Sequence, residues 1–138
     1  MHHHLRADAG GVRKIPQIGS VLQAASQLFL MKLISWNLRG LNSSGKYRMI
    51  KNMIQEGRPQ IIFLQETKCN STTLGSILTK AWSGCHSVAV DASGTSKGLA
   101  IAWDMQNISL TDYHASHNLI QVNFHLIGTN ICGHLSNV

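Results

Sequence analysis

Two polar side chains directly follow apolar segments that have the length of short β-strands. Asn37 comes after the segment 31–36, and Glu66 comes after the segment 60–65. In α/β sheets, ligand-binding groups lie just beyond the carboxyl ends of the strands. A carboxylate there can bind a hard cation such as Mg²⁺, and an amide can orient a phosphate oxygen or the carboxylate. Asn37 and Glu66 are therefore candidate site residues if they face one cleft.

Each of these side chains also has a purely structural interpretation, which the residues alone leave open. Glu66 can pair with Lys68 or be solvated at the end of its strand, and Asn37 can cap a turn. His114 and His117 have a spacing found in some zinc sites, but no matching cysteine or histidine pair accompanies them. Segment 94–98 lacks the GxxxxGK[ST] pattern of a phosphate-binding loop, and no nucleophile has a histidine that can be placed beside it.

The composition is that of one folded domain with a basic surface. Hydrophobic residues make up 43% of the 138 residues and charged residues 13%, which argues against disorder. The net charge of +6 is compatible with a nucleic-acid partner and equally with simple solubility. Three cysteines without a CxxC pair are typical of free thiols inside a cell, and no apolar run reaches the roughly 18 residues of a membrane span.

Residues 1–30 differ from the rest and are expected to lie outside the domain. They begin with His2-His3-His4, are basic, and contain glycines and a proline that interrupt regular structure. The segment 21–30 is apolar enough for a short helix. We expect a leader that is disordered, a targeting segment, or non-native sequence, with the histidine tract incidental. The domain then comprises residues 31–138.

The apolar pattern predicts the elements that position Asn37 and Glu66. Residues 31–36 form a strand, and a helix with an N-cap at Ser43 or Ser44 follows, ending before Pro59. The basic residues of this helix are expected on a solvated face, with a phosphate-binding track as the alternative: Lys46, Arg48 and Lys51. The unbroken run 60–65 is typical of a strand buried on both faces, so a right-handed βαβ unit is the simplest topology.

The second half of the chain changes to closely spaced strands. A helix is predicted over residues 74–82, with the polar segment 70–73 as its cap. The strands that follow are predicted over residues 86–90, 99–103, 108–113 and 119–126, with a polar turn at 114–118 and the start of another strand at 127–132. This spacing favours an antiparallel or mixed meander, and the fold class is α/β.

Three segments resemble motifs of a known family. Residues 34–41 (ISWNLRGL) resemble the opening sWNvRGL of the endonuclease/exonuclease/phosphatase superfamily, and residues 62–68 (IFLQETK) match its flQETK motif. Residues 98–103 (GLAIAW) resemble GGLaiaW, with Lys97 where a glycine is usual. Order and spacing agree from Met31 to about Cys132. The likeness is greatest to the apurinic-endonuclease-type domain of plant LINE retrotransposons.

The resemblance implies a four-layer α/β sandwich that hydrolyses DNA phosphodiesters with Mg²⁺ or Mn²⁺. Such enzymes nick DNA to prime reverse transcription, which implies DNA as the partner, a nuclear location as one option, and no small-molecule cofactor. By position, Glu66 would be the metal ligand, and Asn37 would orient the metal-bound phosphate and that carboxylate. A basic flank would hold the DNA backbone with salt-dependent affinity.

The chain also departs from the family pattern. Cys132 and His134 stand where the family has the tyrosine and proline of its Tyr-Gly-Pro motif, and the Asp-x-Asn and terminal Asp-His motifs do not follow. We therefore expect a partial, truncated sandwich that is inactive as it stands, because catalytic groups act as a unit. The alternatives are a non-catalytic remnant that binds nucleic acid or a partner, and a product without selected function. An uncovered apolar sheet face and open strand edges predict marginal stability.

Overall fold

The computed structural model describes residues 31–138, so the predicted leader with its histidine tract and its helix at 21–30 lies outside the described residues. The elements are, in order, β1 (Leu33–Asn37), α2 (Ser43–Gly57), β2 (Ile61–Gln65), α3 (Ser71–Ala81), β3 (Cys85–Val90), β4 (Leu99–Asp104), β5 (Ile108–Ser116), β6 (Leu119–Leu126) and β7 (Cys132–Asn137). No helix of this part of the chain is long and apolar enough to cross a membrane.

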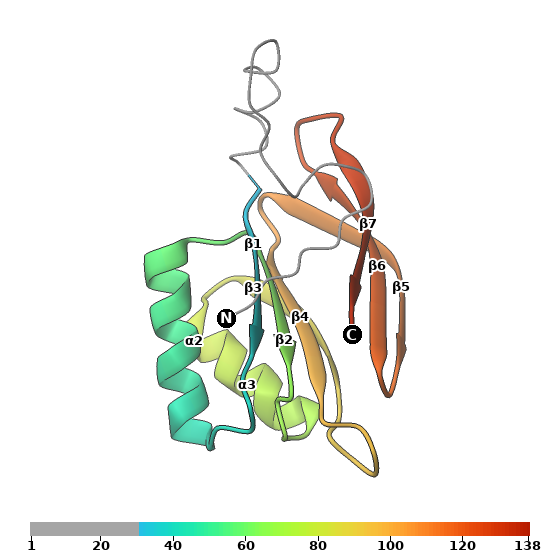
Figure 1. Ribbon diagram of the computed structural model, residues 1–138. Coiled ribbons are helices and arrows are strands. Elements are labelled where there is room, and N and C mark those ends of the chain that lie inside the picture. The colour runs from blue at the N-terminus through green and yellow to red at the C-terminus, as the bar shows by residue number, and fades with distance from the viewer. Residues whose placement is uncertain (1–30) are drawn as a thin grey trace.

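The strands form two sheets that face one another, and both helices cover the outer side of the first (Figure 1). The first sheet has the order β1-β2-β4-β3, and the second has the order β5-β6-β7. β1 and β2 are parallel, whereas the remaining pairs within residues 31–138 are antiparallel. The predicted α/β class, the mixed strand directions and the strand–helix–strand unit with parallel strands are confirmed.

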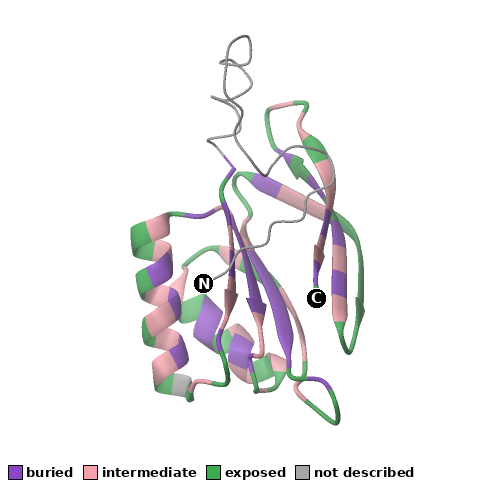
Figure 2. Cartoon of the chain, in the orientation of Figure 1, coloured by how far each residue is buried: buried purple, intermediate pink, exposed green. Residues whose placement is uncertain are grey.

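β2 contributes to both hydrophobic cores of the molecule. Ile61 and Phe63 point between the two sheets, whereas Ile62 and Leu64 point toward the helices. All four side chains are buried, as Figure 2 shows for this strand. Strands covered on both faces need continuous apolar sequence, which is the reason this strand has no polar alternation.

The described residues hold three of the four layers that the resemblance implies. Within residues 31–138 no helix covers the outer face of the second sheet. That face carries polar side chains because β6 alternates, with Gln121, Asn123 and His125 pointing away from Val122 and Phe124. The prediction that an uncovered sheet face would be apolar is therefore wrong for this sheet.

The helices begin earlier than predicted because asparagines cap them. Asn42, not Ser43 or Ser44, is the N-cap of α2, and its side chain accepts a hydrogen bond from Gly45 N at 2.7 Å. Asn70 caps α3 in the same way, so this helix starts at Ser71, before the predicted residue 74. Asparagine at this position satisfies a backbone N–H that the first helical turn leaves unpaired.

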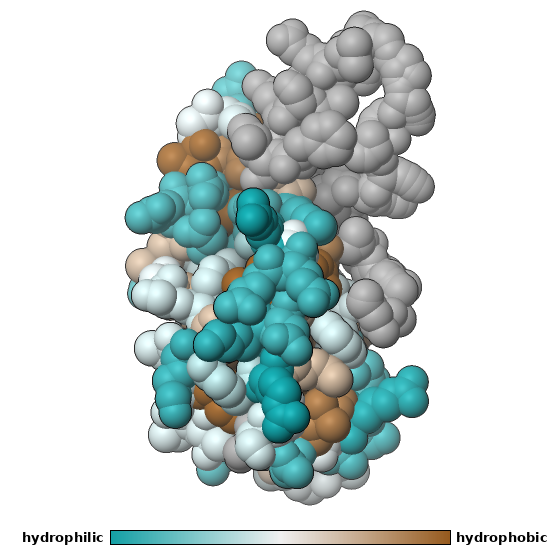
Figure 3. Space-filling model, turned by 90° about the vertical axis from the view of Figure 1, so that its left-hand side faces the viewer, coloured by the Kyte–Doolittle hydropathy of each residue, from teal (hydrophilic) through white to brown (hydrophobic). Residues whose placement is uncertain are grey.

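One of the basic residues of α2 is not solvated as predicted. Lys46 is only 3% exposed, and its Nζ donates a hydrogen bond to the Leu41 carbonyl before the helix. The Nζ of Lys51 instead lies 5.6 Å from the centre of the Tyr47 ring. The face of the molecule formed by α2 is nonetheless largely hydrophilic (Figure 3).

The polar ends of the second sheet were the hardest part to predict. β5 continues to Ser116 through an irregularity between Thr111 and His114, so the predicted turn at 114–118 is wrong in its first half. The further strand predicted to begin within residues 127–132 is present as β7, but it begins only at Cys132, because a turn and an irregular segment occupy residues 127–131. Exposed ends of strands tolerate polar residues, so the sequence there does not show the alternation that would identify a strand.

Substitution of Gly98 by alanine tests the packing between the loop that follows β2 and the loop that precedes β4. Gly98 has a φ of +92°, and a Cβ there would overlap Oγ1 of Thr67. We expect Gly98→Ala to lower the free energy of unfolding by about 3 kcal/mol in urea titrations, combining backbone strain with overpacking. Gly128→Ala is the matched control, because Gly128 has a φ of +84° and no atom within 4 Å of that Cβ. Equal losses in the two variants would contradict this account.

Candidate active site

Asn37 and Glu66 lie together where β1 and β2 end. The parallel register places Asn37 opposite Gln65, and Glu66 follows directly. The Nδ2 of Asn37 donates a hydrogen bond to Oε2 of Glu66 at 2.9 Å. The structure thus brings the two predicted site residues into one place, while their catalytic roles stay a prediction.

Backbone contacts fix the orientation of this pair. The Oδ1 of Asn37 accepts a hydrogen bond from Arg39 N at 2.9 Å, so its Nδ2 has to face Glu66. The carbonyl of Glu66 accepts from Gly40 N at 3.0 Å. Glu66 itself has a φ of +53°, a left-handed conformation that turns its side chain out of the strand direction.

Three cations from three loops surround the Glu66 carboxylate. Arg39 follows β1, Lys68 follows β2, and Lys97 precedes β4. Lys68 N donates to the Lys97 carbonyl at 2.8 Å, which ties the second loop to the third. The hydrogen bond from Asn37 lowers the pKa of Glu66 most. Desolvation opposes it as the second-largest effect, and the charges of Lys97, Lys68 and Arg39 each lower the pKa by less. The carboxylate is therefore ionised at neutral pH.

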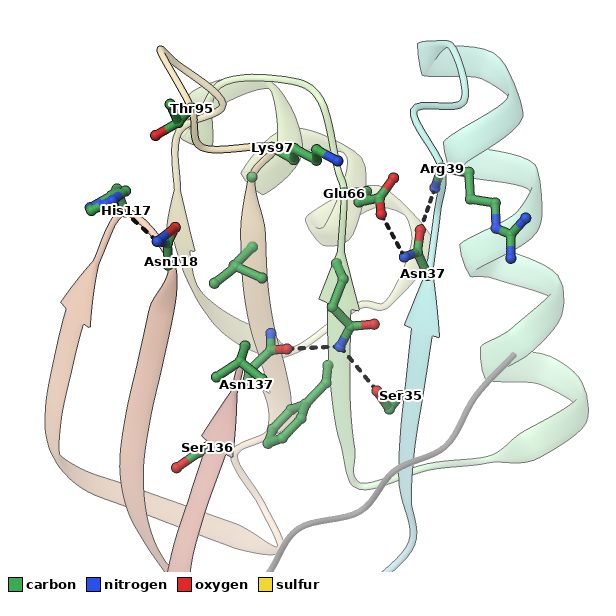
Figure 4. A pocket seen from close by; sticks show the side chains of 15 residues that line it. Ser35, Asn37, Arg39, Glu66, Thr95, Lys97, His117, Asn118, Ser136 and Asn137 are labelled. Atoms are coloured by element: carbon green, nitrogen blue, oxygen red, sulfur yellow. Dashed lines mark hydrogen bonds between the residues drawn. The ribbon is translucent and has the colours of Figure 1, made fainter.

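The pair lies at the rim of a cleft of about 690 Å³ between the ends of the two sheets (Figure 4). Arg39, Glu66 and Lys97 line one side of the cleft, and His117 and Asn118 line the other. The remaining lining residues are Ser35, Asn37, Phe63, Gln65, Thr95, Gly98, Leu99, Ser136, Asn137 and Val138. Glu66 is the one acidic side chain among them, beside the cationic side chains of Arg39 and Lys97.

The site fits a divalent cation that is held by few protein ligands. Oε2 of Glu66 accepts from Asn37, which leaves the second carboxylate oxygen for a cation. Mg²⁺ often uses one or two carboxylates, several waters and substrate phosphates. Residues 31–138 contain no cluster of three or more histidine, cysteine or acidic side chains that could hold a metal. The residues thus suit an open site that water and phosphate complete.

Several lining residues were not singled out from the sequence. Ser35, Gln65 and Asn137 form the polar floor of the cleft, and Asn118 comes from the short turn between β5 and β6. His117, in the same turn, was considered only for a zinc site. Gln65 lies inside the flQETK match, which was a usable signal. Asn137 gave none, because its burial depends on how the second sheet packs on the first.

Cys132 does not occupy a position in the cleft. It begins β7 and pairs with His125, whereas Asn137 at the other end of β7 pairs with Ile120 and lines the cleft. The sequence-based placement of Cys132 at the family's active-site tyrosine is therefore wrong, because Cys132 lies at the end of β7 away from the cleft. The residues of β7 that reach the cleft are Ser136 and Asn137.

The ionisation of Glu66 provides a direct test of the Asn37 contact. Because the folded-state pKa lies below the ordinary value of 4.5, Glu66 contributes stability that is complete above pH 4.5 and is lost as pH falls through the lowered value. We expect Asn37→Ala to raise the pKa of Glu66 toward its ordinary value in carboxyl-detected NMR titrations. An unchanged titration midpoint for Glu66 would refute the assigned cause.

Solved structures of other proteins share this fold. TDP2 from D. rerio, complexed with single-strand DNA product, is 17% identical with a TM-score of 0.56 over 74% of this chain. A mannosyl-6-phosphatase from Bacteroides thetaiotaomicron is 16% identical with a TM-score of 0.58 over 74% of this chain. The AP endonuclease LMAP from Leishmania major is 16% identical with a TM-score of 0.51 over 67% of this chain.

The matched part is a fraction of each of these proteins, 43% of the TDP2 chain, 48% of the phosphatase chain and 35% of the AP endonuclease chain. No curated protein sequence matches this chain. The sequence profile of the Endonuclease/Exonuclease/phosphatase family matches residues 34–131, which include Asn37, Glu66 and the strands of the first sheet. The chain belongs to the endonuclease/exonuclease/phosphatase family.

Proposed function

We propose that residues 31–138 form the metal- and phosphate-binding half of a Mg²⁺-dependent DNA endonuclease of the LINE type. This half binds DNA and a divalent ion but does not cleave DNA by itself. The observation that carries the proposal is the hydrogen-bonded Asn37–Glu66 pair at the rim of a cationic cleft. The match of residues 62–68 to flQETK supports the LINE assignment within the family.

The charge of the site supports a phosphate ligand. The family generally uses a divalent metal, and Mg²⁺ or Mn²⁺ would supply Lewis acidity next to the phosphate that is attacked. Glu66 would hold this ion, and Asn37 would keep the carboxylate turned toward it. Arg39 and Lys97 would contact phosphate oxygens on either side of Glu66.

DNA is the phosphodiester that the observations favour. The net charge of +6 suits a polyanion, and the D. rerio TDP2 neighbour was solved with single-strand DNA product. The large cleft between the sheets is open enough for a nucleic-acid backbone. A non-catalytic nucleic-acid-binding protein is the alternative, and it would use the same cations without requiring the metal.

The absence of cleavage follows from what lines the described cleft. No acidic side chain of residues 31–138 other than Glu66 reaches it. Activation of water in phosphodiester hydrolysis needs a base or a further carboxylate, and such groups act together. The one imidazole that lines the cleft, His117, lies on the side opposite Glu66. We therefore propose that the Asn37–Glu66 pair holds an ion and a phosphate without a base beside the ion that would generate the nucleophile.

Replacement of Lys97 tests whether the cleft binds DNA. We expect Lys97→Ala to weaken binding of a fluorescent single-stranded oligonucleotide about fivefold and to reduce the slope of log K against log salt by about 0.7, one phosphate contact. Fluorescence anisotropy at several salt concentrations measures both. Lys32→Ala is the matched control, since Lys32 is exposed just before β1, at the end of the strand opposite Asn37. Similar losses in the two variants would argue for unspecific attraction.

Replacement of Glu66 tests metal binding and the absence of cleavage together. We expect Mn²⁺ to broaden the NMR signals of the Asn37 side-chain amide, and Glu66→Gln to abolish this effect, because the amide cannot replace the charged ligand. Glu56→Gln, on the exposed side of α2, is the control for metal binding.

The Glu66→Gln variant also tests the absence of cleavage. Supercoiled plasmid incubated with the wild-type chain and Mg²⁺ should stay intact. Nicking that disappears in Glu66→Gln would overturn the proposed lack of cleavage.

A further inference from the structure

A buried amide connects the two sheets directly beneath the Asn37–Glu66 pair. Asn137 of β7 is 1% exposed, and its Nδ2 donates hydrogen bonds to the carbonyls of Leu64 at 3.1 Å and Ala100 at 2.8 Å. Its Oδ1 accepts from Nε2 of Gln65 at 2.7 Å. Because both carbonyls can only accept, the orientation of the Asn137 amide is determined by its neighbours.

Gln65 links this amide to the site. It lies opposite Asn37 in the sheet and directly precedes Glu66. Its Nε2 also donates to Oγ of Ser35 at 3.0 Å, so both amide protons have partners. The connection runs from Ser35 of β1 through Gln65 of β2 to Asn137 of β7 (Figure 4). Its middle member, Gln65, is the residue directly before Glu66.

This connection is directional, whereas the packing of the hydrophobic cluster between the sheets is not. Phe63, Ile101 and Leu135 belong to the cluster between the sheets, and such packing is favourable over a range of relative positions. Hydrogen bonds between buried, fully partnered groups select one arrangement. Asn137 therefore fixes the position of β7 along β2 and β4.

The position of β7 determines where the far side of the cleft lies. Asn137 is paired with Ile120 of β6, the strand that begins immediately after the turn at His117 and Asn118. That turn faces Glu66 and Lys97 across the cleft (Figure 4). A shift of β7 would move β6 and its turn with it, and the width of the cleft would change.

We propose that Gln65 and Asn137 are positioning residues that set the distance between the Glu66 side of the cleft and the His117–Asn118 turn. The fixed width lets one nucleic-acid strand contact both sides at once. The proposal rests on the proposed DNA-binding function. It predicts that oligonucleotide binding depends on Gln65 and Asn137 whereas metal binding does not. The reason is that the Asn37–Glu66 pair lies within the first sheet and does not need β7.

The test compares Asn137→Leu with Asn130→Leu, a matched change at an exposed residue of the turn before β7. We expect Asn137→Leu to weaken oligonucleotide binding about tenfold, since a site that is loosened by a fraction of an ångström loses its preorganisation. Mn²⁺ affinity should stay unchanged. In the ligand-free protein, the backbone amide signals of His117 and Asn118 should shift or broaden.

The double variant Gln65→Leu/Asn137→Leu extends the test if the single variant does not fold, because it removes both amides together and leaves only the Ser35 hydroxyl, among the side chains of this connection, without its partner. It should show the same loss of oligonucleotide binding at unchanged Mn²⁺ affinity. Oligonucleotide affinity equal to that of Asn130→Leu, or a parallel loss of Mn²⁺ affinity, would overturn the positioning role alone. A wild-type chain that retains no oligonucleotide would overturn the proposed function, and this inference with it.

Discussion

The parallel register of β1 and β2 ends the two strands at the same level, with Asn37 opposite Gln65 and Glu66 next in line. β2 cannot slide in this arrangement, because it is buried on both faces. A slip of one residue would exchange Phe63 and Leu64 between two different cores. The apolar packing of one strand thus fixes, at a distance, the 2.9 Å contact between an amide and a carboxylate. The relative position of Asn37 and Glu66 is well defined because the packing of β2 in both cores allows only this register with β1.

Charge and backbone conformation reinforce one another at the end of these strands. The backbones of Arg39, Glu66 and Lys68 have positive φ values, of 54°, 53° and 55°. Residues other than glycine rarely adopt such values. Each costs on the order of 1 kcal/mol, and such strain persists where surrounding contacts determine the geometry. Here the main chains of the loops hydrogen-bond to one another, and the Asn37 side chain holds the Glu66 carboxylate. The Asn37 hydrogen bond lowers the pKa of Glu66 most, and the nearby cations add to this effect. Under the proposed function, the same cations would contact a phosphate.

The sequence was sufficient for those parts of the molecule that local patterns determine. The continuous apolar run of β2, the parallel strand–helix–strand unit and the closeness of Asn37 to Glu66 could all be predicted, since each depends on neighbouring residues or one short connection. The burial of Lys46 could not, because its partner is a loop carbonyl rather than a sequence pattern. The placement of Cys132 failed for a related reason. Motif spacing counts residues along the chain, but the turn at 127–131 decides which end of β7 reaches the cleft.

The two sides of the cleft therefore differ in how they are specified. The side with Asn37 and Glu66 is built from consecutive elements of one sheet, and its geometry follows as soon as β1 and β2 pair. The side with His117 and Asn118 reaches its position only through packing between sheets and the contacts of Asn137 with Leu64 and Ala100. The residues in those contacts are 73 and 37 positions apart in the sequence, so no local sequence pattern predicts them. The proposed ion binding, which would need the first side alone, is for that reason physically independent of the proposed binding of a nucleic-acid strand, which would need both sides.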